Sequence, residues 1–312
     1  MKVSVIIPTY NRAKTICRCL DSVLNQTYRD IEVIVVDDCS QDETEVILTD
    51  IINKGISEVP LFYYRLSQNG GAPKARNYGL KKSKGDYVIF FDSDDEMQLD
   101  RIEKQVKSLQ NGSCNCSVCG YTILNDSGDR LDKIPIVNEK EHLLRQFWTG
   151  LYWSTQSWMY SRDLVLLVGG YDERLVAFQD MDLSFSIVCS GAIKLGVVKE
   201  SLTIFNDCSD ENRIMFKWKT EKGRESLKIV FDKVIKRTIE LKLWSESSFF
   251  IKKELQMFFQ ILKPEDLRKE WNLVSFAILK NIMKASGSLG FIYLVLYFCL
   301  QKLFLDVKFL CK

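Results

Sequence analysis

Proline, histidine and low-complexity tracts are scarce or absent in this chain of 312 residues. Five prolines leave most of the chain free to form regular helices and strands. The hydrophobic fraction of 46% and the charged fraction of 27% are those of a folded globular protein, and no segment has the composition of a disordered region. A large charge of one sign is also missing. The net charge is only +2, which gives no signal for binding to nucleic acid.

The N-terminus has no charged segment followed by an apolar one, so the sequence shows no secretory signal. Disulfides are therefore not expected, and the ten cysteines are predicted to be free thiols of a cytoplasmic protein. Most stand in apolar contexts, as Cys17, Cys39 and Cys189 do, where cysteine acts as a small apolar residue. The spacing Cys114-x-Cys116-x-x-Cys119 has no second pair or histidine cluster beside it, and it predicts a buried strand rather than a zinc site.

Strand-like and helix-like segments alternate in the first third of the chain. Short apolar runs at 3–7, 31–36, 61–64 and 87–91 predict strands, and helical patterns lie between them, one of them at 72–82. This order predicts an α/β fold, with a mostly parallel sheet and helices on both faces. Ligands of such sheets bind outside the carboxyl ends of the strands, where polar clusters follow Ile7, Val36 and Phe91.

The first polar cluster is Pro8-Thr9-Tyr10-Asn11-Arg12, between a predicted strand and a helix. The N-terminus of a helix presents free N–H groups to anions, so this turn can bind a phosphate. A plain turn between strand and helix explains the segment equally well. The segment lacks the G-x-G-x-x-G spacing of dinucleotide-binding proteins, which weakens a nicotinamide or flavin interpretation.

The second cluster is Asp37-Asp38, at the end of the second predicted strand. A carboxylate there can accept a hydrogen bond from a ribose hydroxyl or from a base N–H. The alternative is helix capping, for which Ser40 and Asp42 already suffice; Ser40 and Glu43 together have the pattern of a capping box.

The third cluster is Asp92-Ser93-Asp94-Asp95, directly after a strand of sequence GDYVIFF. Three neighbouring carboxylates repel one another, and a hard divalent cation such as Mg²⁺ or Mn²⁺ offsets this repulsion. A diphosphate bound to the same ion is stabilised as a leaving group. The alternative is a solvated acidic turn without a ligand.

Five blocks, in order, resemble the family 2 glycosyltransferases. They are SVIIPTYNR, VIVVDDCSQDET, NGGAPKARNYGL, GDYVIFFDSDDEM and GGYDERLVAFQDMDLSF, and they span about residues 3 to 187. The resemblance implies a Rossmann-like GT-A fold with a C-terminal helical extension. It also implies an inverting, single-displacement transfer of a sugar from a nucleoside diphosphate sugar, most often a UDP-sugar, with Mn²⁺ or Mg²⁺ as cofactor.

The resemblance also implies which residues bind the donor. Tyr10 would stack on the nucleotide base, and Asp38 would accept a hydrogen bond from that base. Asp94 together with Asp92 would bind the metal. The donor-binding residues carried over by position are Pro8, Thr9, Tyr10, Asn11, Asp38, Arg76, Asn77, Asp92 and Ser93.

The fifth block implies the catalytic base. The family usually has Glu-Asp where this chain has Gln179-Asp180, so Asp180 would remove the proton of the acceptor hydroxyl. Without the other four blocks, Asp180 and Asp182 would be interpreted as a cap and a first-turn acid of a helix. The glutamine departs from the pattern and puts acceptor choice in doubt more than the reaction.

Two further departures limit what the resemblance implies. The Q-x-x-R-W segment of processive members is absent after Asp180, so we expect one sugar per encounter. A histidine that many relatives have downstream is replaced by a stretch with Asn206 and Asp207, either of which could offer an oxygen ligand, and the single histidine is His142. A catalytically silent nucleotide-binding or scaffold protein therefore stays an alternative. A nucleotidyltransferase is disfavoured, because its glycine-rich first loop is missing.

The predicted domains are a catalytic domain at 1–212 and a helical extension at 213–312. The catalytic domain would divide into a nucleotide-sugar half at about 1–112 and an acceptor half at about 113–212. Residues 289–300 form an uncharged apolar run that is too short to span a bilayer, and residues 263–312 hold eight basic and four acidic residues. This favours peripheral contact of about 264–312 with the inner face of the cell membrane, where a glycan or lipid-linked acceptor of surface polysaccharide would be met. Packing of this segment on the catalytic domain or on a partner is the alternative.

Overall fold

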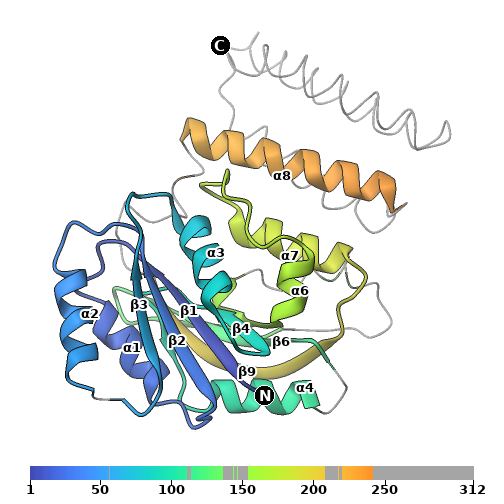
Figure 1. The fold of residues 1–312 in the computed structure, drawn as a ribbon. Coiled ribbons are helices and arrows are strands. Elements are labelled where there is room, and N and C mark those ends of the chain that lie inside the picture. The colour runs from blue at the N-terminus through green and yellow to red at the C-terminus, as the bar shows by residue number, and fades with distance from the viewer. Residues whose placement is uncertain are drawn as a thin grey trace, which may run out of the picture. The chain divides into compact units, whose positions relative to one another are not determined.

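The computed structural model describes residues 1–55, 57–110, 114–135, 143, 146, 154–207, 217 and 220–241. Within them the chain forms a single sheet with helices packed against it (Figure 1). The strands follow the order β3-β2-β1-β4-β8-β6-β9-β5, and β7 pairs with β6 outside this path.

The first part of the chain alternates strand and helix, as the sequence predicts. Strands β1, β2, β3 and β4 pair in parallel, so their carboxyl ends meet at one edge of the sheet. The elements are β1 (Val3–Thr9), α1 (Ile16–Leu24), β2 (Ile31–Asp37), α2 (Thr44–Asn53), β3 (Leu61–Arg65), α3 (Ala72–Lys82) and β4 (Tyr87–Phe90).

The second part continues the same sheet with mixed strand directions. Strand β8 pairs with β4 and β6 in antiparallel fashion, whereas β6 and β9 are parallel to each other. The elements are β5 (Glu96–Met97), α4 (Arg101–Gln110), β6 (Cys116–Asn125), β7 (Arg130–Lys133), η1 (Thr155–Ser157), β8 (Trp158–Ser161), α6 (Arg162–Leu167), α7 (Gln179–Cys189), β9 (Leu195–Asp207) and α8 (Glu221–Glu240).

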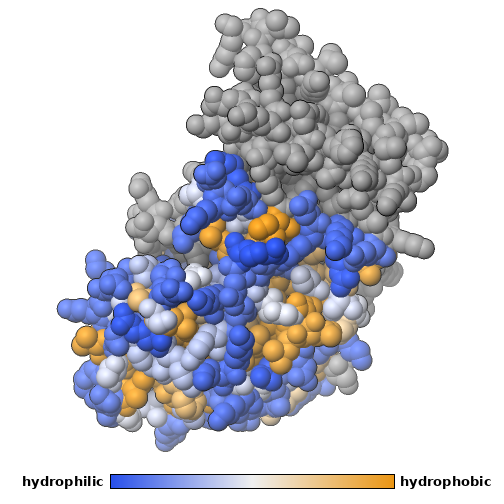
Figure 2. Space-filling view, turned by 45° about the horizontal axis from the view of Figure 1, so that its top comes forward, coloured by the Kyte–Doolittle hydropathy of each residue, from blue (hydrophilic) through white to orange (hydrophobic). Residues whose placement is uncertain are grey.

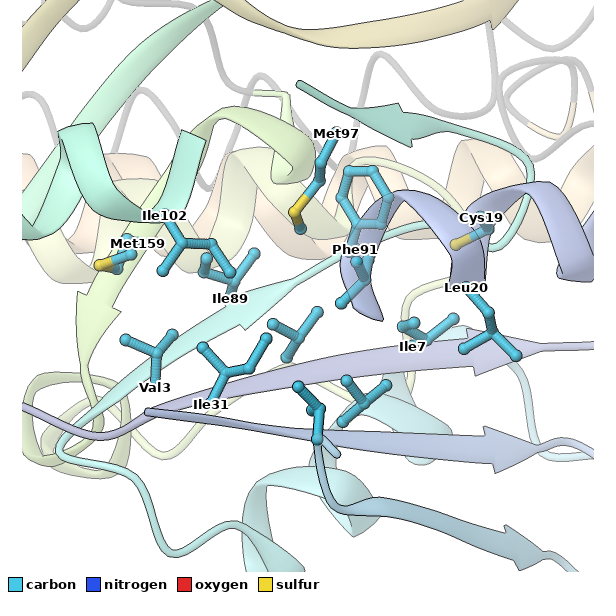
Figure 3. Packing of buried hydrophobic residues seen from close by; sticks show 14 of the residues in the cluster. Val3, Ile7, Cys19, Leu20, Ile31, Ile89, Phe91, Met97, Ile102 and Met159 are labelled. Carbon is cyan, nitrogen blue, oxygen red and sulfur yellow. The ribbon is translucent and has the colours of Figure 1, made fainter. Parts of the chain in front are cut away.

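Helices cover both faces of the sheet, and the α/β fold class is confirmed. Alternate residues of a strand point to opposite faces. Val5 and Ile7 of β1 pack in one cluster with Ile16 and Leu20 of α1, part of which is shown in Figure 3. Their neighbour Ile6 packs in another cluster that includes residues of α3, α6 and α7. Strands β1 and β2 are buried along their whole length, which explains their nearly continuous apolar sequence.

The start of α2 differs from the prediction. The helix begins at Thr44, and the side chain of Glu43, the residue at the N-cap position, makes no capping hydrogen bond. The predicted capping box of Ser40 and Glu43 is therefore wrong. Ser40 accepts a hydrogen bond from the backbone N–H of Asn11 instead, and Asp42 accepts one from the N–H of Thr44. Ser40 thus joins the loop after β2 to the loop after β1 at this edge of the sheet.

The cysteines of the described residues are free thiols, as predicted. Cys116 and Cys119 are buried in β6, which confirms the strand. Cys189 is buried, but Cys17 is exposed and Cys39 is half-buried, so the apolar-context prediction is wrong for Cys17. An amphipathic helix presents every third or fourth position to water, and Cys17 falls on that side of α1 between buried Ile16 and Cys19.

Among the described residues, no helix combines the length and hydropathy needed to cross a membrane. The apolar run at 289–300 lies outside these residues. On the face seen in Figure 2, hydrophobic residues occur in separate groups between hydrophilic ones.

Candidate active site

The acidic turn, Asp92 to Asp95, follows the carboxyl end of β4, at the edge of the sheet where β1 and β2 also end. Asp92 forms an ion pair with Arg76 of α3, at 2.7 Å between Oδ1 and Nη2. Its other oxygen accepts a hydrogen bond from the side-chain amide of Gln156, also at 2.7 Å. Ser93 is buried in the turn.

Asp95, the last residue of this turn, is completely buried. It accepts hydrogen bonds from the Gln156 side chain at 2.7 Å and from the backbone N–H of Asn206 at 3.0 Å. Burial, followed by the charges of Asp94 and Asp92, raises the pKa of Asp95 well above its usual value. Burial and the neighbouring carboxylates thus both favour the protonated form of Asp95.

Asp94 is partly buried and forms an ion pair with Arg12, whose Nη2 lies 3.4 Å from Oδ2. The described residues contain no group of three or more acidic, histidine or cysteine side chains that could enclose a metal ion. The donor set fits a different kind of site. Mg²⁺ and Mn²⁺ at nucleotides are commonly held by one or two carboxylates together with phosphate oxygens and water. Asp94 and Asp92, which are both partly exposed, supply carboxylates of this kind.

Arg76 joins the acidic turn to the start of α7. Its side chain is 2% exposed, and its Nη1 donates to Oε1 of Gln179 at 2.8 Å. Its guanidinium also lies over the ring of Tyr171, 5.0 Å from the centroid. Burial alone lowers the pKa of Arg76, but the neighbouring acidic groups, Asp92 first, produce a net rise. Arg76 is thus a buried permanent cation between the turn and α7.

Asn77 faces the loop that precedes α7. Its amide nitrogen donates to the carbonyl of Tyr171 and to Glu173, both at 2.9 Å, and its oxygen accepts from the N–H of Tyr171. Gly170, with φ of 73°, comes so close that a Cβ atom there would lie 2.7 Å from the Asn77 amide oxygen. Adjacent residues of α3 therefore bind the acidic turn and the α7 loop at the same time.

Asp38 holds the loop that leads into α3. Its two carboxylate oxygens accept hydrogen bonds from the N–H groups of Gly70 and Gly71, each at 2.7 Å. Burial is the largest influence and raises the pKa of Asp38, against the lowering effect of these two hydrogen bonds. Its own N–H donates to the carbonyl of Thr9, so the ends of β1 and β2 are joined at this point.

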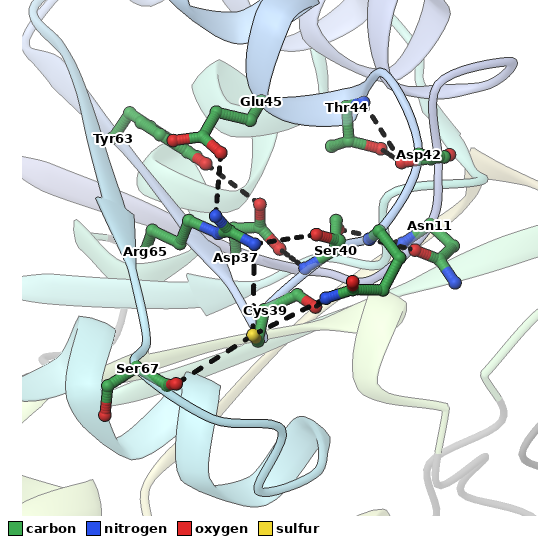
Figure 4. A network of polar contacts seen from close by, with 11 residues as sticks. Asn11, Asp37, Cys39, Ser40, Asp42, Thr44, Glu45, Tyr63, Arg65 and Ser67 are labelled. Atoms are coloured by element: carbon green, nitrogen blue, oxygen red, sulfur yellow. Dashed lines mark hydrogen bonds and ion pairs between the residues drawn. The ribbon is translucent and has the colours of Figure 1, made fainter.

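Asp37 belongs to a separate polar network (Figure 4). It accepts hydrogen bonds from the backbone N–H of Ser40 and from the hydroxyl of Tyr63. Arg65 of the same strand as Tyr63 donates to the Ser40 carbonyl and to Glu45. Burial, and then this contact with Asp37, raises the pKa of Tyr63. The two neighbouring acids thus have different tasks, because Asp37 fixes the loop after β2 whereas Asp38 reaches the glycines before α3.

The cluster after β1 combines buried and exposed groups. Pro8 and Thr9 are buried at the end of the strand, whereas Tyr10 is 41% exposed. Asn11 adopts a left-handed backbone conformation, with φ of 52°, and its side-chain oxygen accepts from the N–H of Gln41. This geometry turns the chain sharply after β1 and leaves the Tyr10 ring accessible.

Asp180 lies in the first turn of α7, next to Gln179. The helix follows Phe178, whose φ of 60° is left-handed, and no side chain caps it. Burial raises the pKa of Asp180, and the Arg76 guanidinium opposes this rise. Asp180 is therefore a partly buried carboxylate, beside the same cation that binds Asp92, and it is not the N-cap.

The structure brings Arg76, Asp92 and Asp180 together from three separated segments, and it places Asp38 with Thr9 at the neighbouring strand ends. Asn206 lies beside the acidic turn, but its side-chain nitrogen donates to the Asp94 carbonyl and to Glu96. Asp207 ends β9, and His142 lies outside the described residues.

Sequence reasoning missed Gln156 and Tyr171. Tyr171 belongs to the fifth block, where it follows two glycines. An aromatic residue at that place in a motif could have been predicted to lie near the site. Gln156 has no such signal, because it reaches Asp92 across 64 positions of sequence.

A family model described as "Glycosyl transferase family 2" matches residues 4–167. The "Putative teichuronic acid biosynthesis glycosyltransferase TuaG" of Bacillus subtilis is 41% identical over 131 residues, which cover 42% of this chain and 51% of TuaG. The "Glycosyltransferase GlyA" of Streptococcus pneumoniae is 37% identical over 127 residues, which cover 40% of this chain and 18% of GlyA. The matched segments thus span about half, or less, of the length of these relatives.

Solved structures show the same fold. TarS of S. aureus, residues 1–349 in complex with UDP-GlcNAc, superposes with a TM-score of 0.68 and 21% identity, over 90% of this chain and 82% of that one. The mannosyltransferase PcManGT of Pyrobaculum calidifontis, in complex with GDP-Man and Mn²⁺, superposes with a TM-score of 0.60 and 19% identity, over 97% and 80% of the two chains. The predicted GT-A type of α/β fold is confirmed by these likenesses.

Proposed function

The chain belongs to glycosyl transferase family 2, and we propose that it moves one sugar at a time, with inversion, from a nucleoside diphosphate sugar to a hydroxyl of a glycan or lipid-linked acceptor. The observation that carries this proposal is the position of Arg76, which binds Asp92 of the acidic turn and Gln179 at the start of α7. One buried cation thereby lies between a carboxylate turn suited to a metal-bound diphosphate and the carboxylate of Asp180.

The donor would lie across the carboxyl ends of β1, β2 and β4. The exposed ring of Tyr10 offers a surface on which a base can stack, and Asp38 lies beside the end of β1 where it could accept a base N–H. Pro8, Thr9 and Asn11 would shape this end of the site. Arg76, Asp92 and Ser93 would face the ribose and the diphosphate, and Asn77 would fix the neighbouring loop. A UDP-sugar is the proposed donor, which agrees with the UDP-GlcNAc bound to TarS.

Asp94 and Asp92 would hold the Mn²⁺ or Mg²⁺ ion, whose positive charge stabilises the departing diphosphate when it is bound. The proposal draws on the partly exposed carboxylates of Asp92 and Asp94 in one turn and on the Mn²⁺ in the PcManGT complex.

Asp180 would act as the base. The acceptor oxygen forms a bond to the anomeric carbon and gives its proton to the Asp180 carboxylate. The bond from that carbon to the diphosphate oxygen breaks, and the nucleoside diphosphate leaves with the electron pair. Burial raises the pKa of Asp180 and so favours uptake of a proton, and the Arg76 cation opposes this rise. Because the acceptor attacks once, from the face opposite the leaving group, the configuration inverts.

The sugar is proposed to be a hexosyl or N-acetylhexosaminyl group, and the product a cell-surface polysaccharide. The teichuronic acid biosynthesis in the name of TuaG supports a polysaccharide of this kind. Contact of residues 264–312 with the cytoplasmic face of the membrane would bring a lipid-linked acceptor within reach. The catalytic domain would end near residue 212, with its donor half before residue 112.

A panel of nucleotide sugars tests this function. The purified protein is incubated with each donor and Mn²⁺, and release of the nucleoside diphosphate is measured with and without a chelator. We expect release from a UDP-sugar that the chelator abolishes and that Asp94→Ala removes while the protein still melts cooperatively. Binding of the nucleotide without any release, across the whole panel and with candidate acceptors added, would instead support a catalytically silent scaffold.

A further inference from the structure

Gln156 occupies an unusual position between two acids of the same turn. Its side-chain nitrogen is 2.7 Å from Oδ2 of Asp92 and 2.7 Å from Oδ2 of Asp95. A primary amide nitrogen carries two hydrogens, so each carboxylate receives one of them. Gln156 is 4% exposed, and it lies in the short helix η1, which is followed directly by β8.

The amide of Gln156 is held in one orientation. The hydroxyl of Ser154 donates to its side-chain oxygen, which directs the nitrogen toward the two acids. The backbone carbonyl of Gln156 accepts from the hydroxyl of Thr203 on β9 at 3.2 Å, so the main chain is fixed as well. The side-chain N–H groups of Gln156 are therefore in position before any ligand binds.

Asp92 and Asp95 would repel each other without this amide. Charged hydrogen bonds of 2.7 Å are among the strong ones. Asp92 is consequently held from two sides, by Arg76 on Oδ1 and by Gln156 on Oδ2. Asp95 is likewise fixed from two sides, by Gln156 and by the N–H of Asn206 on β9. The orientation of the acidic turn thus depends on η1 and β9 as well as on α3.

A second buried glutamine provides a contrast in the same molecule. Gln105 of α4 is fully buried and also donates twice, but its partners are the backbone carbonyls of Ser117 and Ser157. The oxygen of Gln105 accepts a hydrogen bond from the Arg101 guanidinium at 3.1 Å, so Gln105 contacts no acid of the turn, whereas Gln156 donates to two carboxyl groups there.

We propose that Gln156 is a positioning residue, which sets Asp92 and Asp95 in the orientation that the metal-bound diphosphate of the donor requires. The inference rests on the proposed function, because it assigns a task within the same site. Outer groups that orient the carboxylates of a metal site commonly change metal affinity or activity by about 10- to 100-fold when they are removed.

Matched variants test the inference. Gln156→Met and Gln105→Met each replace a buried glutamine by an apolar side chain of similar volume. For each protein we would measure the Mn²⁺ concentration that half-saturates UDP release from UDP-GlcNAc. The rise in melting temperature on adding UDP and Mn²⁺ together gives a readout that does not depend on turnover.

For Gln156→Met we expect the half-saturating Mn²⁺ concentration to rise by about tenfold or more, and the combined thermal shift to shrink. For Gln105→Met we expect a lower melting temperature without ligand, but a metal response equal to that of the wild type. Equal metal responses in the two variants would overturn the inference while leaving the proposed function intact.

Ser154→Ala covers the case in which Gln156→Met does not fold. Ser154 is partly exposed, and its loss frees the Gln156 amide to turn without opening a cavity. We expect a smaller change in the same direction. An unchanged metal response in Ser154→Ala, with Gln156→Met unfolded, would contradict the proposal. If the wild type itself shows neither metal-dependent release nor a thermal shift, the proposed function fails first, and the inference fails with it.

Discussion

At the scale of single residues, Arg76 is the group on which the site depends most. It is a buried cation that pairs with one carboxylate and one amide, and its partner Asp92 keeps part of its surface in water. Removing one member of a buried ion pair leaves an uncompensated charge. This lowers the free energy of unfolding by more than the intact pair contributes to it. Arg76 therefore has a structural task in addition to any contact with the donor.

We expect Arg76→Met to lower the free energy of unfolding by about 3 kcal/mol, near the low end for a buried pair because Asp92 is partly exposed. Urea denaturation measures this change. Arg174→Met is the control, since Arg174 is 67% exposed and its pair with Asp172 should contribute less than about 1 kcal/mol. Equal losses in the two variants would show that Arg76 does not stabilise the fold in this way.

Asp180 illustrates a conflict between stability and activity. In the folded protein its pKa is raised, so the folded state binds more protons than the unfolded chain in the interval between the two pKa values. The stability of the wild type therefore falls as the pH rises through that interval, starting near pH 4. A neutral side chain at this position does not have this pH dependence.

For Asp180→Asn we predict a loss of turnover of about 100- to 10,000-fold, with the affinity for UDP nearly unchanged, because a base acts in the transition state. The same variant should melt at an equal or higher temperature than the wild type, with an advantage that grows as the pH rises above about 4. Kinetics, UDP titration and melting curves over pH measure these effects. A collapse of UDP affinity, or a lower melting temperature at neutral pH, would mean that Asp180 is a structural residue of α7.

At the scale of elements, helix α3 and the glycine loop before it connect the parts of the site. Asp38 binds the N–H groups of Gly70 and Gly71, and the next turns of α3 bring Arg76 and Asn77 to the acidic turn and to the α7 loop. Gly71 has φ of 86° and ψ of 161°, a conformation that is open almost only to glycine. The backbone of this loop is therefore part of the site.

We predict that Gly71→Ala weakens UDP binding by about tenfold, corresponding to 1.4 kcal/mol. Alanine is strained in the backbone conformation of Gly71, so the loop should shift and move the N–H that donates to Asp38. Gly128→Ala is the matched control. Gly128 has a similar φ of 82° and lies in the exposed turn between β6 and β7. None of the residues assigned to the nucleotide-sugar donor belongs to that turn. Isothermal titration with UDP compares the two variants, and identical affinities would contradict the role assigned to the loop.

Sequence patterns predicted the elements where one physical cause dominates. The strands at 3–7 and 31–36 were found because residues buried on both faces must be apolar. The capping box at Ser40 failed because that pattern is local, whereas the hydroxyl of Ser40 binds Asn11, 29 positions earlier. The proposed role of Asp92 comes from the acidic cluster and the motif resemblance together, and that of Asp180 from the resemblance. The contact of Gln156 with the acidic turn could not be predicted, because only the fold brings its amide there.

At the scale of the whole molecule, the residues assigned to the donor all precede residue 190, whereas the apolar and basic segment lies after residue 263. We predict that removing the residues after Ser286 releases the protein from membranes and preserves metal-dependent release of UDP. Flotation with anionic liposomes at low and high salt measures binding, which should weaken with salt because lysines contribute to it. A full-length protein that never floats, or a truncated one that no longer melts cooperatively, would exclude the membrane role.

The central claim is that one direct displacement, assisted by Asp180, transfers the sugar. Proton NMR of the first sugar product formed from an alpha-linked donor such as UDP-GlcNAc tests it most directly, with methanol as a simple acceptor. The account predicts a beta-linked product that is formed only with Mn²⁺ or Mg²⁺ and that is missing with Asp180→Asn. An alpha-linked product, or an undiminished yield from Asp180→Asn, would contradict it.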